Sequence, residues 1–298
     1  MVSAEVLEPT TACPACCGRL LRPLGSKDDY GMSQCSKCRV VFLDGQAGSQ
    51  ATAELYDHYY DRARFDLPAA AEASLERLAG SIEPFRKTSR WLDVGYGEGG
   101  LLGIAHRQGW HCYGTEVSTQ ALSYGQKQGW TVTNVEDDPR FPLAGFDVVT
   151  MIEFLEHVPA PDQFLLSAAR WLRAGGLLYI TTPNVNSLNR HALGLDWSIF
   201  SPPEHVTIWS ARGLRHAVEK AGFKVRRVRT EGFNPSEIVA RVRSGKGMAE
   251  TVDRNTAAFA LNSAFTSSPL RRTIKSAINL GLSAFQVGDT LKVWAVRS

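Results

Sequence analysis

The chain has 298 residues, of which 44% are hydrophobic and 21% are charged. This composition provides enough apolar surface for a large core, so it excludes a disordered, a collagen-like and a disulfide-scaffold protein. No apolar run approaches the roughly 18 to 20 residues that span a membrane, and the first residues lack the pattern of a secretory signal. We therefore expect a globular cytoplasmic protein with at most peripheral membrane contact.

The net charge of +3 hides an uneven distribution. Residues 51–211 carry 12 Lys or Arg and 19 Asp or Glu, whereas residues 212–298 carry 16 and 6. The basic final third is consistent with an anionic substrate or partner, and equally with an ordinary solvated surface. Both interpretations stay open at this point.

Four of the six cysteines form two C-x2-C pairs, Cys13 with Cys16 and Cys35 with Cys38. Two such pairs can supply four thiolates to one tetrahedral Zn²⁺, and cytoplasmic thiols are expected to stay reduced. The pattern predicts a structural zinc ribbon over residues 1–45. The balanced charge and the few aromatic side chains of the ribbon favour a role in scaffolding or substrate docking. Nucleic-acid binding is the less favoured alternative.

After the ribbon, residues 46–84 are expected to form a linker and a helical cap. From residue 88, short apolar runs alternate with helical stretches, which predicts a parallel sheet with helices on both faces. The expected strands are 90–96, 110–117, 129–135, 146–152, 175–182, 223–230 and 288–298. The expected helices are 98–109, 118–129, 160–174 and 210–221.

A glycine-rich loop follows the first of these strands. The sequence from Asp93 to Gly99 reads D-x-G-x-G-x-G, and glycines let the backbone turn tightly and approach a ligand closely. Glu116 ends the second strand, 23 residues after Asp93, where its carboxylate can accept both hydroxyls of a ribose. A dinucleotide loop would read G-x-G-x-x-G, so the combination indicates another nucleoside-bearing cofactor.

These motifs resemble those of the class I S-adenosylmethionine-dependent methyltransferases over about residues 85–235. LDVGYGEGG resembles the first motif, GTEVS the second, FDVVTMIEFLEHV the fourth and LRAGGLLYITTPN the segment around the fifth strand. The ribbon and the last strand also match a zinc-ribbon subset of the family. One departure is Tyr96, where the family often has a small residue or Cys, so the loop is expected to be slightly reshaped.

The resemblance implies a Rossmann-like sheet that is mostly parallel with an antiparallel last strand, and S-adenosyl-L-methionine as the cofactor. It implies the cofactor-binding residues Asp93, Gly95, Tyr96, Gly97, Gly99, Glu116, Val117 and Ile152. The adenine is expected to meet Glu136 or Asp137, and the resemblance does not decide between them.

The fourth motif contains Glu153, Glu156 and His157, and His205 follows the next strand in SPPEHVTIW. Residues at i, i+3 and i+4 share a helical face, and the carboxyl ends of neighbouring parallel strands lie together. The set is similar to that of the small-RNA 2′-O-methyltransferases, in which a metal binds a vicinal diol, and of ubiquinone-pathway O-methyltransferases.

Three interpretations of these four residues stay open. They could hold Mg²⁺ or Mn²⁺, they could move a proton through His157 or His205 with Glu153 orienting a histidine, or they could be structural. We expect methylation of a hydroxyl on a small or carrier-linked acceptor. The alternatives are an RNA methyltransferase that docks RNA on the ribbon, and a catalytically silent scaffold.

The last part of the chain, residues 236–298, is expected to hold a basic helical insertion and the final strand. Four apolar residues share the spacing of one helical face: Leu270, Ile274, Ile278 and Phe285. Such a helix could lie over the active site and meet an anionic or lipid-linked substrate, or it could only cover the edge of the sheet.

Overall fold

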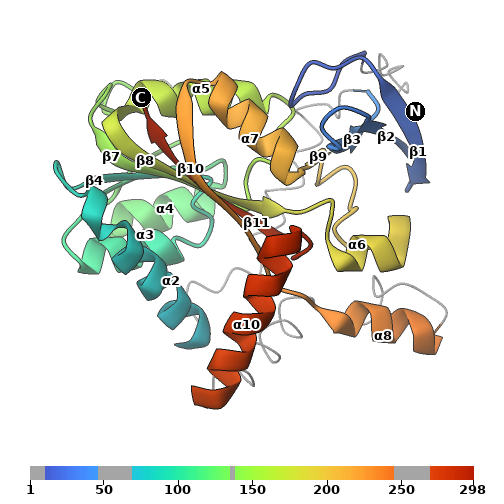
Figure 1. Ribbon diagram of the computed structural model, residues 1–298. Coiled ribbons are helices and arrows are strands. Elements are labelled where there is room, and N and C mark those ends of the chain that lie inside the picture. The colour runs from blue at the N-terminus through green and yellow to red at the C-terminus, as the bar shows by residue number, and fades with distance from the viewer. Residues whose placement is uncertain (1–10, 46–68, 135–137, 245–268) are drawn as a thin grey trace.

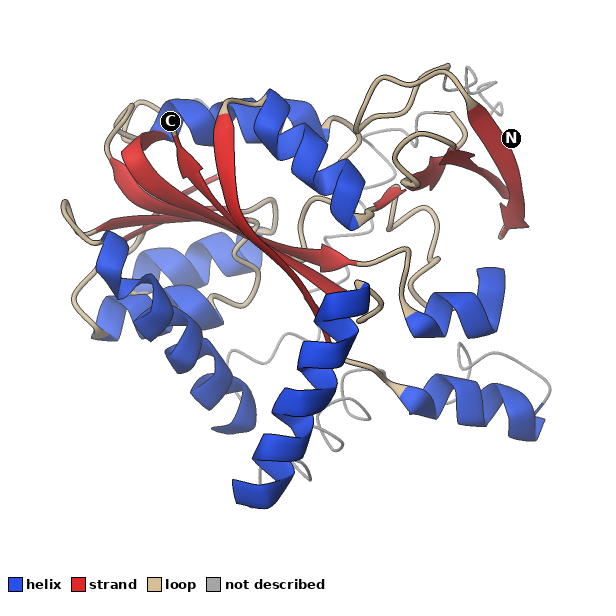
Figure 2. Ribbon diagram, in the orientation of Figure 1, coloured by secondary structure: helices blue, strands red, loops and turns tan. Residues whose placement is uncertain are grey.

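The computed structural model describes residues 11–45, 69–134, 138–244 and 269–298 (Figure 1). A large sheet carries helices on both faces, and a small sheet lies to one side of it near the start of the described chain (Figure 2). Within these ranges, no helix has the length and apolar character that crossing a membrane requires.

The large sheet has seven strands in the order β10-β11-β8-β7-β4-β5-β6. Their bounds are β4 (Arg90–Val94), β5 (His111–Thr115), β6 (Thr131–Thr133), β7 (Phe146–Ile152), β8 (Leu172–Pro183), β10 (Phe223–Glu231) and β11 (Thr290–Arg297). Strands β4 to β8 pair in parallel, whereas β11 runs antiparallel to both β8 and β10. The predicted Rossmann-like sheet with an antiparallel last strand is confirmed.

The central strands are buried on both faces, which is why they read as continuous apolar runs in the sequence. On one face α2 (Ala69–Ile82), α3 (Gly100–Arg107) and α4 (Thr119–Lys127) pack on side chains such as Trp91 and Val148. On the other face α5 (Pro161–Trp171) and α7 (Ala211–Lys220) pack on side chains such as Leu92 and Val149 (Figure 2).

Most predicted elements differ from the structure by one to three residues at their ends, and one of these differences has a clear physical cause. The helix expected over residues 160–174 ends at Trp171, and Leu172 already belongs to β8, where it pairs with Phe146 of β7. The register of the sheet, which is a long-range interaction, therefore overrides the local helical pattern at this point.

The small sheet joins the cysteine-rich region to the chain that follows β8. Its order is β1-β2-β3-β9, with β1 (Leu21–Lys27), β2 (Tyr30–Cys35), β3 (Val41–Leu43) and β9 (Thr207–Ile208). Strand β9 comes two residues after His205, and it pairs antiparallel with β3. The ribbon is therefore hydrogen-bonded to the segment that directly follows His205, one of the candidate site residues.

Between β8 and β9 the chain forms α6 (Leu188–Leu193) and the short 3-10 helix η3 (Gly194–Asp196), and α8 (Pro235–Ser244) follows β10. The last helix, α10 (Pro269–Phe285), extends away from the sheet and contacts it near its C-terminal end, where Thr230 Oγ1 donates to Leu282 O at 2.8 Å (Figure 1). On the predicted apolar face, Ile278 and Phe285 are exposed, and the side chains of Leu270 and Ile274 lie outside the described part.

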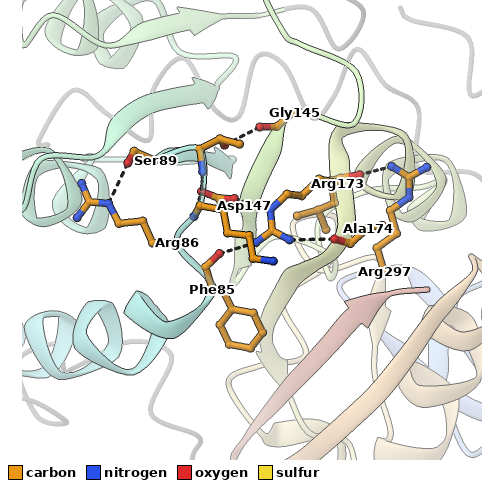
Figure 3. Close-up of polar contacts among 11 residues, drawn as sticks. Phe85, Arg86, Ser89, Gly145, Asp147, Arg173, Ala174 and Arg297 are labelled. Atoms are coloured by element: carbon orange, nitrogen blue, oxygen red, sulfur yellow. Dashed lines mark hydrogen bonds and ion pairs between the residues drawn. The ribbon is translucent and has the colours of Figure 1, made fainter.

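A buried ion pair ties the amino ends of the strands to the 3-10 helix η2 (Glu83–Phe85) (Figure 3). Asp147 is fully buried and accepts hydrogen bonds from Arg173 Nε at 2.6 Å, Lys87 N at 2.8 Å and Thr88 N at 2.6 Å. Burial alone would raise the pKa of Asp147, but these hydrogen bonds outweigh it and hold the pKa below its usual value. This end of the sheet lies opposite the candidate site.

Candidate active site

The glycine-rich loop after β4 adopts a conformation that requires its glycines. Gly95, Gly97 and Gly99 have φ angles of 67°, 57° and 73°, in the left-handed region that disfavours other residues. A Cβ atom on Gly95 would lie 2.4 Å from Phe154 Cδ2. The loop therefore turns tightly at the carboxyl end of the sheet, which is where open α/β sheets bind their ligands.

Glu116, at the end of β5, is joined to this loop. Its Oε2 accepts a hydrogen bond from Gly97 N at 2.9 Å, and its Oε1 accepts from Val117 N at 2.7 Å and Ser118 N at 3.2 Å. A carboxylate oriented in this way at a strand end suits the two hydroxyls of a ribose. Val117 is 56% exposed beside it and offers apolar surface to a purine.

Asp93 ends β4 in a buried position under the loop. Thr150 Oγ1 donates to Asp93 Oδ1 at 2.5 Å, and Trp91 Nε1 donates to the same hydroxyl at 3.0 Å. Burial, and to a smaller extent the charge of Glu116, raises the pKa of Asp93 to about 7. A cationic ligand group near Asp93 would favour its ionised form and lower this pKa.

The side chain of Tyr96 does not line the loop. It is 6% exposed, its Oη donates to Ala121 O at 2.8 Å, and its ring meets Trp130 edge to face. Gly114 leaves the space for this ring, because a Cβ there would lie 2.4 Å from it. Tyr96, one of the cofactor residues expected from the resemblance, can therefore offer only its backbone to a ligand.

Three other cofactor residues are expected from the resemblance, and the structure describes one of them. Ile152 is half-buried at the end of β7, on the same edge of the sheet. Glu136 and Asp137 lie outside the described residues, so the position of the adenine stays a prediction.

The second half of the site follows β7. Residues 153–158 form a turn and not a helix, so the argument from a shared helical face was wrong. Glu153 has a φ of 48°, which breaks the helical spacing at its first residue. Two consecutive hydroxyls of β8 then hold the two acids: Thr181 Oγ1 donates to Glu153 Oε1 at 2.8 Å, and Thr182 Oγ1 donates to Glu156 Oε2 at 2.9 Å.

Three of the four predicted residues converge at this point. Glu156, His157 and His205 each offer one ligand atom, and these atoms lie within 4.8 Å of one another. The two imidazole rings are 4.6 Å apart, and His157 Nε2 is 4.0 Å from Glu156 Oε1. Glu153 lies outside this group. We refer to Glu156, His157 and His205 as the acceptor cluster.

The backbone orients both histidines of the acceptor cluster. His157 Nδ1 is 3.1 Å from Glu204 O, and His205 Nδ1 is 2.6 Å from Ile199 O. Because a carbonyl can only accept, each Nδ1 carries the proton, and Nε2 is the basic nitrogen of the neutral ring. This tautomer serves equally for a general base and for a metal ligand.

Burial also shifts the pKa values of side chains in the acceptor cluster. It lowers the pKa of His157, which the carboxylate of Glu204 opposes in part. Glu156 is fully buried, and burial together with the charge of Glu153 raises its pKa well above the usual value. Its Oε1 has no hydrogen-bond partner in the part of the chain that the structure describes. Burial therefore favours the neutral forms of both groups.

The four ribbon cysteines form a second cluster. Their buried sulfur atoms lie within 4.8 Å of one another, with Cys13 Sγ 3.4 Å from Cys38 Sγ and Cys16 Sγ 3.6 Å from Cys35 Sγ. A tetrahedral zinc site with Zn–S bonds of about 2.3 Å separates its sulfurs by about 3.8 Å. The hydrogen bond between Cys13 and Cys38 lowers the pKa of the Cys13 thiol to about 5 and raises the pKa of Cys38, as expected of two thiols that share one proton. The donor set fits the predicted Zn²⁺.

Sequence reasoning missed the threonines that hold the acids. Thr150, Thr181 and Thr182 are buried and donate to Asp93, Glu153 and Glu156 in turn. Their signal was present, because each is a hydroxyl residue in an otherwise apolar strand that is covered on both faces. A buried hydroxyl needs a partner, and the nearest strand ends carry the acids.

Comparison with known proteins identifies the family. A family model described as a methyltransferase domain matches residues 58–228. The chain is similar to a protein named ubiquinone biosynthesis O-methyltransferase from Marinobacter nauticus, with 33% identity over 172 residues, 49% of this chain and 68% of that protein. The same enzyme of Hahella chejuensis is 36% identical over 105 residues, 33% of this chain and 44% of its own. The chain thus spans about half the length of several curated relatives.

Solved structures show the same fold. A geranyl diphosphate C-methyltransferase from Streptomyces coelicolor A3(2) superimposes with a TM-score of 0.52 at 14% identity, covering 85% of this chain and 100% of its own. A SAM-dependent methyltransferase from Archaeoglobus fulgidus gives a TM-score of 0.50 at 19% identity, covering 82% and 99%. Since the family model also spans more than half of the chain, the protein belongs to the methyltransferase domain family, as a class I S-adenosylmethionine-dependent methyltransferase.

Proposed function

We propose that the protein methylates a hydroxyl of a small-molecule acceptor bound at the acceptor cluster. The observation that carries the proposal is the convergence of Glu156, His157 and His205 within 4.8 Å, beyond the ends of β7 and β8 and on the same edge of the sheet as the glycine-rich loop. The relatives named ubiquinone biosynthesis O-methyltransferase support transfer to oxygen. They do not favour an RNA methyltransferase or a silent scaffold.

The cofactor half of the site would hold S-adenosylmethionine, which supplies an electrophilic methyl group on a sulfonium. The loop from Gly95 to Gly99 lets the backbone approach the cofactor, and Glu116 suits the ribose hydroxyls. Asp93 is placed under the loop, where its carboxylate can balance the positive charge of the cofactor.

The acceptor half would handle the proton of the hydroxyl. A hydroxyl at its ordinary pKa is a weak nucleophile, so a base must take the proton as the carbon–oxygen bond forms. The basic Nε2 of His157 or His205 is suited to this, because backbone carbonyls hold both Nδ1 protons. Glu153 is a positioning residue in this scheme, since its charge acts on the neighbouring Glu156.

A divalent cation is the second candidate for activating the hydroxyl. Two imidazoles and one carboxyl suit Mg²⁺ poorly, because Mg²⁺ prefers an octahedron of oxygen ligands. Burial, which raises the pKa of Glu156, also opposes the loss of the proton that a ligand carboxyl must undergo. These two features favour direct proton transfer to a histidine over Mg²⁺ or Mn²⁺.

An anionic group on the acceptor is supported by Arg190 of α6. Its Nε is buried without a hydrogen-bond partner among the described residues, and its guanidinium lies 6.0 Å from the ring of Phe200. Phe200 and His205 border the same packing gap in the core, which is too small to hold a water molecule. Among the residues that the structure describes Arg190 forms no ion pair, and such a cation suits a carboxylate or a phosphate group of an acceptor.

The test is methyl transfer from labelled S-adenosylmethionine to a panel of phenols and catechols. We expect the rate to rise with pH through a histidine-like ionisation, and His157→Gln or His205→Gln to lower kcat by about 10² to 10⁴ with unchanged cofactor affinity. His111→Gln is the matched control, because His111 is exposed at the opposite end of the sheet. A double histidine variant that folds, binds cofactor and turns over at the full rate would contradict the proposal.

A chelator distinguishes the two ways of activating the hydroxyl. If a divalent cation acts, chelation abolishes turnover and Mg²⁺ or Mn²⁺ restores it without a change in cofactor affinity. If a histidine acts alone, turnover continues. Zinc content must be followed in the same samples, because removal of metal from the ribbon would mimic the loss of an active-site metal.

A further inference from the structure

Backbone hydrogen bonds of Val206 and its neighbour Thr207 connect the ribbon to the acceptor cluster. Leu43 N, in ribbon strand β3, donates to Val206 O at 3.0 Å. Val206 N and Thr207 N in turn donate to Glu156 O at 2.8 and 3.1 Å. Val206 therefore links the ribbon to the turn that carries Glu156 and His157, and it is also the neighbour of His205. All three residues of the acceptor cluster lie within one residue of this connection.

A second connection runs through a predicted zinc ligand. Ser210 Oγ donates to Cys38 O and accepts from Gly213 N, so that it caps α7 and bonds to the cysteine pair at the same time. The ribbon and α7 are also in close contact: a Cβ on Gly213 would lie 2.2 Å from Val40 Cγ2. The absence of a side chain at Gly213 is what allows the ribbon to approach α7.

The apolar side chains of the ribbon complete the core under His205. Met32, Val41 and Leu43 of the ribbon and Phe200, Val206 and Ile208 of the later segment are all buried in one cluster. His205 Nδ1 bonds to Ile199 O inside this segment. Without the ribbon these apolar side chains would be exposed to water, which is unfavourable.

We infer that the ribbon is a part of the acceptor site: its metal-held cysteine pairs fix β3 and the start of α7, and these position Val206, Glu156 and His205. The inference rests on the proposed function only for the role of the acceptor cluster. The cofactor loop depends on other contacts, since Gly95 N and Tyr96 N donate to Thr115 O and Gly97 N donates to Glu116. Disturbing the ribbon should therefore affect the acceptor half and spare the cofactor half.

Gly213→Ala tests the inference without changing a cysteine or a residue of the acceptor cluster. It inserts a methyl group against Val40, which is fully buried and has little room to move. Gly80→Ala is the matched control, because Gly80 also lies in a helix and nothing lies within 4 Å of its added Cβ. Leu43→Pro is a second variant, which removes the N–H that bonds to Val206 O.

The measurements are zinc content, cofactor affinity by calorimetry, the imidazole NMR signals of His157 and His205, and kcat. For Gly213→Ala and Leu43→Pro we expect one bound zinc, cofactor affinity within about twofold of the unchanged protein, shifted imidazole signals and a kcat lower by about 10 to 100-fold. Gly80→Ala should match the unchanged protein in all four. Imidazole signals that stay in place in both ribbon variants overturn the inference.

Removal of the zinc gives an independent result. Cys38→Ser should lose the metal and shift the imidazole signals while S-adenosylhomocysteine still binds. Equal loss of S-adenosylhomocysteine binding would show that the ribbon supports the whole fold, and it would overturn the inference. If the unchanged protein methylates no hydroxyl acceptor, the proposed function fails, but the imidazole signals still decide whether the ribbon positions the acceptor cluster.

Discussion

The buried carboxyl of Asp93 should make the stability of the protein fall as the pH rises toward neutrality. Asp93 is 4% exposed, and its pKa is raised from 3.8 to about 7 in the folded state. The folded protein then binds the proton more tightly than the unfolded chain does. The stabilisation that protonated Asp93 contributes is therefore fully present below pH 3.8 and is lost as the pH rises from 3.8 through 7.

Asp93→Asn should remove this dependence. A shift of about three pH units corresponds to about 4 kcal/mol of unfolding free energy, or about 1.4 kcal/mol for each pH unit inside the window. Asparagine keeps an acceptor oxygen for Thr150 Oγ1 but cannot ionise. The difference in stability between the variant and the unchanged protein should be small near pH 4 and should grow in favour of the variant toward pH 8.

Urea unfolding with zinc present, at half-unit steps from pH 4 to 8, measures this difference, and the other titrating groups cancel in the comparison. Asp138→Asn is a matched control of opposite sign. Hydrogen bonds from Arg140 hold the pKa of Asp138 below its usual value of 3.8, so that variant should lose stability by a constant amount from pH 4 to 8 and recover it only below pH 3.8. Parallel curves for Asp93→Asn and the unchanged protein across the window would refute the reasoning.

Three further predictions concern affinity and stability. Glu116→Gln should weaken S-adenosylhomocysteine binding by about tenfold or more in a calorimetric titration, because it removes the charged acceptor at the end of β5, whereas the exposed Glu98→Gln should not. Arg173→Met leaves Asp147 as a buried charge without its cation and should cost about 3 to 5 kcal/mol in urea unfolding, with unchanged cofactor affinity. Arg190→Gln should raise KM about tenfold or more for acceptors that carry a carboxylate, and leave KM unchanged for uncharged analogues.

Much of the large sheet could be predicted because its strands carry their signal locally. Strand β7 is buried over nearly its whole length, and its apolar run matches the predicted bounds of 146–152. Strand β9 could not be predicted, since it is two residues long and exists only because it pairs with β3. Its partner lies far away in the sequence, and no local pattern records that pairing.

The candidate site divides in the same way. The glycine-rich loop and Glu116 were predicted from spacing, because both lie within one strand–helix–strand unit. The convergence of His205 with the fourth motif was predicted from the rule that neighbouring strands end together. The shape of the turn from Glu153 to His157 was not, because it depends on the hydroxyls of Thr181 and Thr182 in another strand.

This division has a physical consequence for the two substrates. The contacts described for the cofactor half run between β4 and β5, which a single short crossover joins. The acceptor half combines the end of β7, the chain after β8 and the ribbon, which meet through backbone hydrogen bonds of Val206 and Thr207 and through the buried apolar cluster beneath His205. The contacts described for the cofactor half therefore do not pass through the ribbon, whereas those of the acceptor half do. Cofactor binding should consequently tolerate changes in the ribbon that acceptor turnover does not.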